Sequence, residues 1–136
     1  MELEQQLASV PLLAGLDTRI RRRLAETGKR RTYAPDEEIV REGSTGTALY
    51  IILSGTARVV RGAEGIGEVG AGDFFGELAL IEEHPRSASV IASTETECLL
   101  FPAWEFTALL EEHPEIAVPI MRALIGRLHR REHHGA

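Results

Sequence analysis

The sequence predicts a mainly β domain, a small β-barrel of roll type with helices before and after it. Three observations predict this class. Between residues 30 and 102, short apolar runs alternate with turns rich in glycine and proline, which is typical of a sandwich or barrel. On either side of this region, apolar residues recur at helical spacing. The 136 residues are the length of one domain that can bury a real core.

Two helices are expected in residues 1–28. Apolar residues line one face of the first helix at positions i, i+4 and i+7: Leu3, Leu7 and Val10. Pro11 ends that helix, because proline cannot continue the helical hydrogen-bond pattern. The second helix can begin at Asp17, whose carboxylate accepts hydrogen bonds from free backbone N–H groups, and can end at Gly28.

The β region is expected over residues 29–102. Its apolar runs are separated by turns and predict these strands: Ile39–Val40, Leu49–Leu53, Thr56–Arg61, Val90–Ile91 and Cys98–Phe101. Within this region, Gly65–Gly70 spells G-x-G-x-x-G, a pattern found in dinucleotide sites. Such a site needs the run to open a helix, whereas another turn, Ala71–Asp73, follows here at once. The glycines are therefore interpreted as part of a short hairpin.

A helical pattern returns over residues 103–133. Its final segment has apolar residues in an i+4 row: Ile116, Ile120, Leu124 and Leu128. Pro114 is acceptable at a helix start. Pro119 follows within the same segment, where it removes a backbone donor and clashes with the preceding turn. The last helix is therefore expected to kink or restart near Pro119.

One stretch carries the most specific chemistry of the chain. Phe75–Leu80 sets a glycine and an acid at the start of a short apolar turn, and Pro85–Val90 adds one arginine beside two hydroxyls. A helix start offers unpaired N–H groups to an anion, and Gly76 has no Cβ to keep a phosphate away. Arg86 brings a fork of donors that matches phosphate oxygens, whereas ionised Glu77 only accepts and suits a sugar hydroxyl. Together these groups predict a site for a sugar phosphate.

This run, residues 75–90, resembles the phosphate-binding cassette of the cyclic nucleotide-binding domain family, which includes bacterial cyclic AMP receptor proteins and regulatory subunits of cyclic-nucleotide kinases. The family pattern, F-G-E-[LI]-A-L, a short loop and P-R-x-A-[ST]-V, is filled at every fixed position. The resemblance covers about residues 10–131. It implies a double-stranded β-helix (jelly-roll) barrel in one domain, 1–136, with N-terminal helices over 1–28, the roll over 29–102, and C-terminal hinge and lid helices of the B and C type over 103–133.

The resemblance also implies a function, that of a sensor or regulatory module that binds a cyclic nucleotide and signals by moving its C-terminal helices. Cyclic AMP (cAMP) is the first choice and cyclic GMP (cGMP) the second, since Ser87 beside the arginine leaves the base undecided. Ser89 is either a second contact or a strand-surface hydroxyl, and Arg131 is either a lid residue or an exposed helix-end charge. The implied ligand-binding residues are Gly76, Glu77, Leu78, Arg86, Ser87, Ala88, Ser89, the base-contacting Val40 and Ile66, and Arg131.

Two other classes of function stay open. One is a non-binding relative that acts as a protein-interaction module. The other, a metal-dependent cupin-like barrel enzyme, needs two or three histidines and a glutamate on facing strands, yet the strand region contains only His84. His129 and His133 have a metal-binding spacing but lie at a polar chain end without a third ligand in view. We therefore expect no catalytic residue, no metal and no cofactor besides the nucleotide ligand.

Composition narrows the partners and the compartment. The net charge of −6 argues against nonspecific binding to nucleic acid, and we expect no DNA-binding domain in this chain. No apolar run approaches the roughly 20 residues that span a bilayer, so no membrane segment is expected. The lone cysteine, Cys98, excludes an internal disulfide and fits a reducing cytoplasm.

The expected macromolecular partner is a protein effector of unknown identity. Met121, Ile125 and Leu128 either pair two lid helices in a homodimer or cover the barrel. The arginine-rich stretches Arg19–Arg31 and Arg122–Arg131 are either solvated helix faces or a docking surface for an acidic partner. The chain is either a free-standing sensor or the regulatory part of a longer protein.

Overall fold

The computed structural model describes residues 3–46, 48–76 and 85–135, and the side chains of the last helix as far as residue 126. The chain divides into two compact units. One contains residues 1–26 and 108–136, and the other contains residues 27–107. The candidate site lies in the second unit, so that unit comes first.

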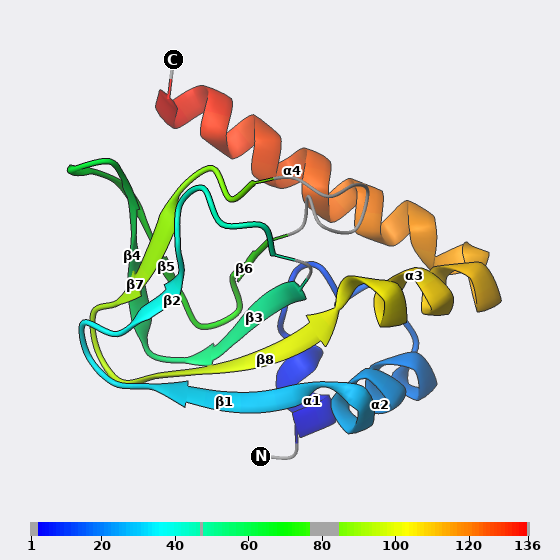
Figure 1. Cartoon of the computed structure of the whole chain (residues 1–136). Coiled ribbons are helices and arrows are strands. Elements are labelled where there is room, and N and C mark those ends of the chain that lie inside the picture. The colour runs from blue at the N-terminus through cyan, green and yellow to red at the C-terminus, as the bar shows by residue number, and fades with distance from the viewer. Residues whose placement is uncertain (1–2, 47, 77–84, 136) are drawn as a thin grey trace. The chain divides into compact units, whose positions relative to one another are not determined.

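Where the structure describes it, the β unit contains two antiparallel four-stranded sheets (Figure 1). The strands are β1 (Lys29–Tyr33), β2 (Glu38–Val40), β3 (Ala48–Ser54), β4 (Thr56–Arg61), β5 (Glu64–Gly70), β6 (Phe74–Phe75), β7 (Ser89–Ala92) and β8 (Thr96–Pro102). Their order is β1-β8-β3-β6 in one sheet and β2-β7-β4-β5 in the other. The prediction of a mainly β fold with flanking helices is confirmed. The described strands do not close into one barrel, however, because each sheet ends in edge strands.

The two sheets pack face to face around one apolar core. Because successive side chains of a strand alternate between the two faces, every second residue of the inner strands points into this core. The buried cluster takes Tyr33, Ile52, Phe75 and Cys98 from the first sheet and Ile39, Ala57, Val90 and Ala92 from the second. Tyr50 and Leu100 are partly buried against it. Aliphatic and aromatic side chains from both sheets thus bury each other, and this burial supplies the main stabilisation of the unit.

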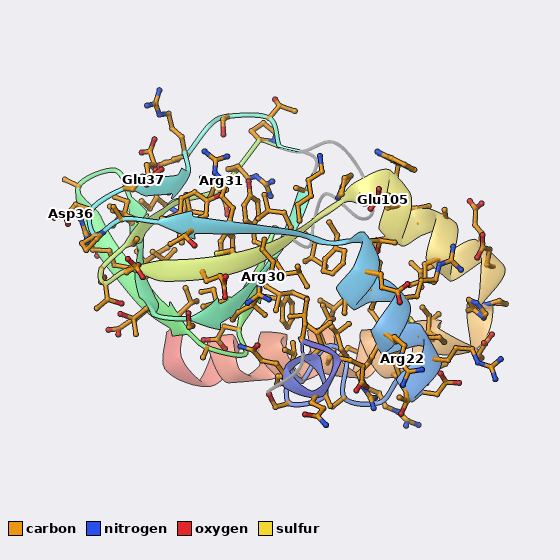
Figure 2. All side chains as sticks on the ribbon, turned by 90° about the horizontal axis from the view of Figure 1, so that it is seen from below. Arg22, Arg30, Arg31, Asp36, Glu37 and Glu105 are labelled. Carbon is orange, nitrogen blue, oxygen red and sulfur yellow. The ribbon has the colours of Figure 1, made fainter. Side chains whose placement is uncertain are left out.

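Strand β1 illustrates the alternation. Arg30 and Arg31 lie on opposite sides of this strand in Figure 2. Arg30 forms an ion pair with Glu97 on the neighbouring strand β8, with a nitrogen–oxygen distance of 2.8 Å. The guanidinium of Arg31 lies 5.1 Å from the centre of the Tyr33 ring, on the face of the sheet that bears the core. An edge strand with charged side chains is protected from pairing with other chains.

Gly28, which directly precedes β1, lies close to buried side chains of the β unit. Helix α2 (Thr18–Thr27) ends immediately before it. A Cβ on Gly28 would lie 2.7 Å from Leu99 Cγ and 2.8 Å from Phe101 Cε1. Both of these side chains are buried. Glycine is needed here for space, since its φ lies outside the left-handed range.

The other helices in the described residues are α1 (Leu3–Leu7), α3 (Ala103–Glu112), the 3-10 turn η2 (Pro114–Ile116) and α4 (Ala117–Gly135). The expected restart near Pro119 is found two residues earlier, where η2 ends and α4 begins. Pro119 is therefore in the first turn of α4, where backbone N–H groups have no helical acceptor and proline removes no hydrogen bond. Gly15 accommodates it, because a Cβ there would lie 2.9 Å from Pro119 Cβ.

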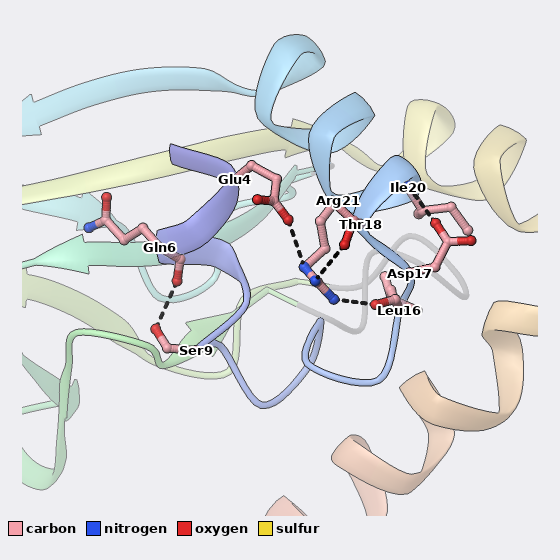
Figure 3. Close-up of polar contacts among 8 residues, drawn as sticks. All are labelled: Glu4, Gln6, Ser9, Leu16, Asp17, Thr18, Ile20 and Arg21. Atoms are coloured by element: carbon pink, nitrogen blue, oxygen red, sulfur yellow. Dashed lines mark hydrogen bonds and ion pairs between the residues drawn. The ribbon is translucent and has the colours of Figure 1, made fainter. Parts of the chain in front are cut away.

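Arg21 connects three parts of the helical unit (Figure 3). Its Nε donates to Glu4 in α1 over 3.2 Å, and its Nη1 donates to the Leu16 carbonyl. Both side chains of the Arg21–Glu4 pair are largely buried, at 13% and 16% exposure, so it is screened less than a surface pair. Asp17 caps α2 as expected, because its carboxylate accepts from the Ile20 N–H over 3.1 Å. Among the described residues, no helix is long and apolar enough to cross a membrane.

Candidate ligand-binding site

Arg86 is fixed at its backbone to the turn that precedes β3. Its N–H donates to the Ser44 carbonyl and its carbonyl accepts from the Gly43 N–H, both over 2.8 Å. Thr45 and Pro85 form a β-bridge beside these bonds. These bonds fix the position of the Arg86 backbone shortly before β7. Residues 77–84, which come just before it in the chain, lie outside the described part of the structure. Two predicted ligand residues, Glu77 and Leu78, fall in that range.

The Arg86 side chain extends from there toward β3. Its Nη2 donates to the Ala48 carbonyl over 3.0 Å. Its Cζ lies 5.8 Å from the centre of the Tyr50 ring, within the range of a cation–π interaction. That ring stacks in turn on Phe75, with centres 4.9 Å apart and planes inclined by 7°. The guanidinium thus lies at the end of an aromatic stack that belongs to the core.

Two glycines lie directly against this guanidinium. Gly76 follows β6 with φ +84°, and a Cβ there would lie 2.6 Å from both Arg86 Nη1 and the Ala48 carbonyl oxygen. A Cβ on Gly46 would lie 2.6 Å from Arg86 Cζ. Real Cβ atoms essentially never approach another heavy atom within 3.0 Å. The sequence predicted a close approach at Gly76, and the structure has the arginine itself in that contact.

The three residues after Arg86 differ in their exposure. Ser87 is exposed, and its carbonyl accepts from Arg61 Nε over 3.1 Å. Ala88 is buried. The Ser89 hydroxyl oxygen accepts from the Glu42 N–H over 2.9 Å, a bond within the fold that leaves its O–H free to donate elsewhere. Of the two hydroxyls, that of Ser87 is more open to a ligand.

The two predicted base contacts lie on opposite edges of one sheet. Val40 is in edge strand β2 and pairs with Val90, so it lies beside the cassette and packs against the core. Ile66 is in the other edge strand, β5, at a register shift, and is 44% exposed. Three strand spacings of about 4.8 Å each separate them along the sheet. Arg131 belongs to α4, but its side chain is outside the described part of the structure.

Burial dominates the electrostatics around the aromatic stack. Desolvation raises the pKa of Tyr50, while the nearby Arg86 and Arg31 guanidinium groups act in the opposite direction. Burial raises the pKa of the Cys98 thiol to about 12, so at neutral pH it is a protonated core group. In the described ranges, no group of three or more histidine, cysteine, aspartate or glutamate side chains is placed to hold a metal ion.

Among the described residues, four that contact the cassette were not predicted as site residues from the sequence: Gly46, Ala48, Tyr50 and Arg61. Tyr50 carried a usable signal, since it lies in a predicted strand, has a polar tip, and falls on the same alternating face as Ile52. Gly46 was visible only as a turn residue. Ala48 contributes its backbone carbonyl, and the pattern of side chains in the sequence cannot predict such a contact.

The comparisons with known proteins agree with this fold. The family model for "Cyclic nucleotide-binding domain" matches residues 30–113, which is more than half of the chain. The chain belongs to the cyclic nucleotide-binding domain family. It is a regulatory domain of that family, mainly β, with the family's sheets and flanking helices.

Three similar proteins illustrate the range of the family. A cAMP-dependent protein kinase regulatory subunit of Hypocrea atroviridis is 36% identical over 107 residues, which are 79% of this chain and 23% of that protein. The regulatory domain of Toxoplasma gondii PKA, crystallised with cAMP, has TM-score 0.74 and 32% identity, covering 79% of this chain and 44% of that one.

The third is the regulatory subunit of a cAMP-independent protein kinase A from Trypanosoma brucei. It has TM-score 0.77 and 32% identity, and the match covers 90% of this chain and 43% of that one. The chain thus spans less than half the length of each of these three proteins.

Proposed function

We propose that this domain binds a cyclic nucleoside monophosphate at the cassette, with cAMP preferred and cGMP second. One observation carries the proposal most directly. The Arg86 guanidinium lies directly against Gly76, whose missing Cβ leaves room for it, and the next residue in the chain is the exposed Ser87. A singly charged cyclic phosphate needs a planar cation and backbone that can approach it closely, and this corner offers both.

The relatives support cAMP as the first ligand to test. The Hypocrea subunit is named as cAMP-dependent, and the Toxoplasma regulatory domain was crystallised with cAMP. In the proposed complex Arg86 and Ser87 hold the phosphate, and Glu77 accepts from the ribose hydroxyl. Gly76, Leu78, Ala88 and Ser89 complete the wall, and Val40 contacts the base; Ile66 and Arg131 are retained as contacts to be tested.

The proposed output is a movement of the C-terminal helices that a protein effector reads. A ligand can shift that movement only if it binds one helix position better than another. Exposed apolar side chains occur on α4 at helical spacing, namely Val118, Met121 and Ile125. They are our candidates for contact with an effector or for a homodimer, and Met121→Glu with sedimentation analysis distinguishes a dimer from a monomer.

Isothermal titration of the purified protein with cAMP, cGMP and 5′-AMP tests the binding step. We expect both cyclic nucleotides to bind, cAMP more tightly, and 5′-AMP to bind far more weakly. Charge-assisted hydrogen bonds contribute about 1.5–3 kcal/mol, so Arg86→Ala should raise Kd by about 10- to 150-fold. Arg30→Ala is the matched control, because Arg30 is a half-exposed, ion-paired arginine on β1, outside the cassette.

Equal affinities of the Arg86→Ala and Arg30→Ala variants would refute the assignment of the phosphate contact. The Trypanosoma relative favours a second candidate, a regulatory module of the same fold that does not respond to cAMP. Absence of heat with either cyclic nucleotide at millimolar concentration, on protein that unfolds cooperatively, would select that candidate over the first.

A further inference from the structure

Position 46 has no room for a side chain, because the Arg86 guanidinium occupies the space that a Cβ would fill. A Cβ at this position would meet only atoms of Arg86 among its three nearest neighbours, with Cζ 2.6 Å away and two guanidinium nitrogens closer still. The φ of Gly46 lies outside the left-handed range, so its backbone conformation does not require glycine. The absent side chain therefore makes room for one particular group, the cation of the cassette.

The Tyr50 ring also restricts the position of the Arg86 guanidinium. Its ring centre lies 5.8 Å from Arg86 Cζ, and the ring is held by stacking on Phe75, its partner in the β3–β6 pairing. Tyr50 is partly buried against the core cluster. A ring held this way offers a fixed π face, and cations are attracted to such faces within about 6 Å.

The Ala48 carbonyl completes the arrangement. It accepts a hydrogen bond from Arg86 Nη2 over 3.0 Å. A guanidinium has five N–H donors in one plane, so this bond restricts its movement by engaging one donor, while the other donors remain for a ligand. Gly46, Tyr50 and Ala48 together leave the arginine little freedom.

We propose that Gly46 and Tyr50 are positioning residues that hold the Arg86 guanidinium in its binding orientation before the ligand arrives. The inference rests on the proposed function in one respect, that the anion received is a cyclic phosphate. A free arginine loses rotamer freedom when it binds, and that loss weakens binding; a pre-ordered arginine has less to lose. Affinity then depends on residues that need not touch the ligand.

The first test is Gly46→Ala against Gly65→Ala, a matched control in β5 where a Cβ meets nothing within 4 Å. Gly46→Ala should raise the Kd for cAMP by about tenfold or more, because the guanidinium must move. Its unfolding midpoint without ligand should equal that of the control. In the Arg86→Ala variant, adding Gly46→Ala should cause no further loss of affinity, because Gly46 acts on the ligand through Arg86. A purely structural effect of Gly46→Ala would weaken binding in that variant too.

The second test uses Tyr50. Tyr50→Phe keeps the π face and should bind cAMP like the wild type, whereas Tyr50→Leu should weaken binding about three- to tenfold. Equal loss in both variants would overturn the role of the ring. An additive effect of Gly46→Ala in the Arg86→Ala background would overturn the role of Gly46.

A ligand-free readout separates this inference from the proposed function. The Arg86 Nε–H signal in ¹H–¹⁵N spectra, assigned by its loss in Arg86→Ala, should show the ring-current shift of Tyr50. The shift should persist in Tyr50→Phe and disappear in Tyr50→Leu and in Gly46→Ala. An unchanged signal in all variants would refute the positioning role, whatever the ligand. The expected shifts in a protein that binds no cyclic nucleotide would support the positioning role and refute the proposed function.

Discussion

Gly43 and Gly76 form a natural pair for measuring how much the crowding at the cassette matters to stability. Both have a left-handed backbone, with φ +82° and +84°. A Cβ on Gly43 would meet nothing within 4 Å, whereas one on Gly76 would lie 2.6 Å from the Ala48 carbonyl oxygen and from Arg86 Nη1. Replacing each by alanine therefore places a Cβ at nearly the same positive φ but against different contacts.

The magnitudes follow from these two terms. Left-handed backbone costs a residue with a Cβ about 1–2 kcal/mol, and that is the whole expected effect of Gly43→Ala. In Gly76→Ala the methyl group also meets a backbone carbonyl in β3, which the neighbouring strands hold in place. Overpacking of this kind costs about 1–3 kcal/mol more. The total for Gly76→Ala is then about 2–5 kcal/mol.

Thermal and urea unfolding, followed by circular dichroism without ligand, measure both variants. For a chain of this length, each kcal/mol corresponds to about 4 °C in the midpoint. We expect Gly43→Ala to lose about 4–8 °C and Gly76→Ala about 8–20 °C. If Gly76→Ala loses no more than Gly43→Ala, the Ala48 carbonyl and Arg86 do not press on this position and the reasoning is wrong.

Two further predictions concern the core. Gly28→Ala should destabilise by about 2 kcal/mol, since its methyl group meets two buried side chains within 2.8 Å, while Gly65→Ala, which meets nothing, should not destabilise; equal unfolding midpoints would contradict this. Burial raises the pKa of Tyr33 and of the Cys98 thiol to about 12, from ordinary values near 10 and 9. The folded state favours the neutral form of both groups, so each contributes fully to the free energy of unfolding at pH values below its ordinary pKa. This contribution is lost as the pH rises toward 12, by about 1.4 kcal/mol per pH unit for each group. In urea unfolding, Cys98→Ala should lose less stability between pH 9 and 10 than the wild type, and identical losses would count against a buried thiol.

The elements of this fold were visible in the sequence wherever their causes are local. The strands around Leu49–Leu53 and Thr56–Arg61 follow from apolar runs between turns, and α2 follows from Asp17 at one end and Gly28 at the other. The α4 restart was expected near Pro119, because proline limits a helix through its own ring. The order of the strands within the two sheets was not predicted, since it depends on which strand edges meet and no local pattern encodes it.

In the candidate site, too, the residues close together in the sequence could be predicted, and those brought together only by the fold could not. The glycine and the arginine of the cassette lie ten positions apart in one recognisable run, so the order of residues announces their chemistry. Gly46 and Tyr50 are separated from Arg86 by 36–40 positions and reach it only through the bridge at Pro85 and the pairing of β3 with β6. The sequence by itself determined that Gly76 and Arg86 belong to one run, and it predicted that this run binds a ligand. Only the tertiary structure decided where that cation is held, because close approach and aromatic contact are properties of distance in space.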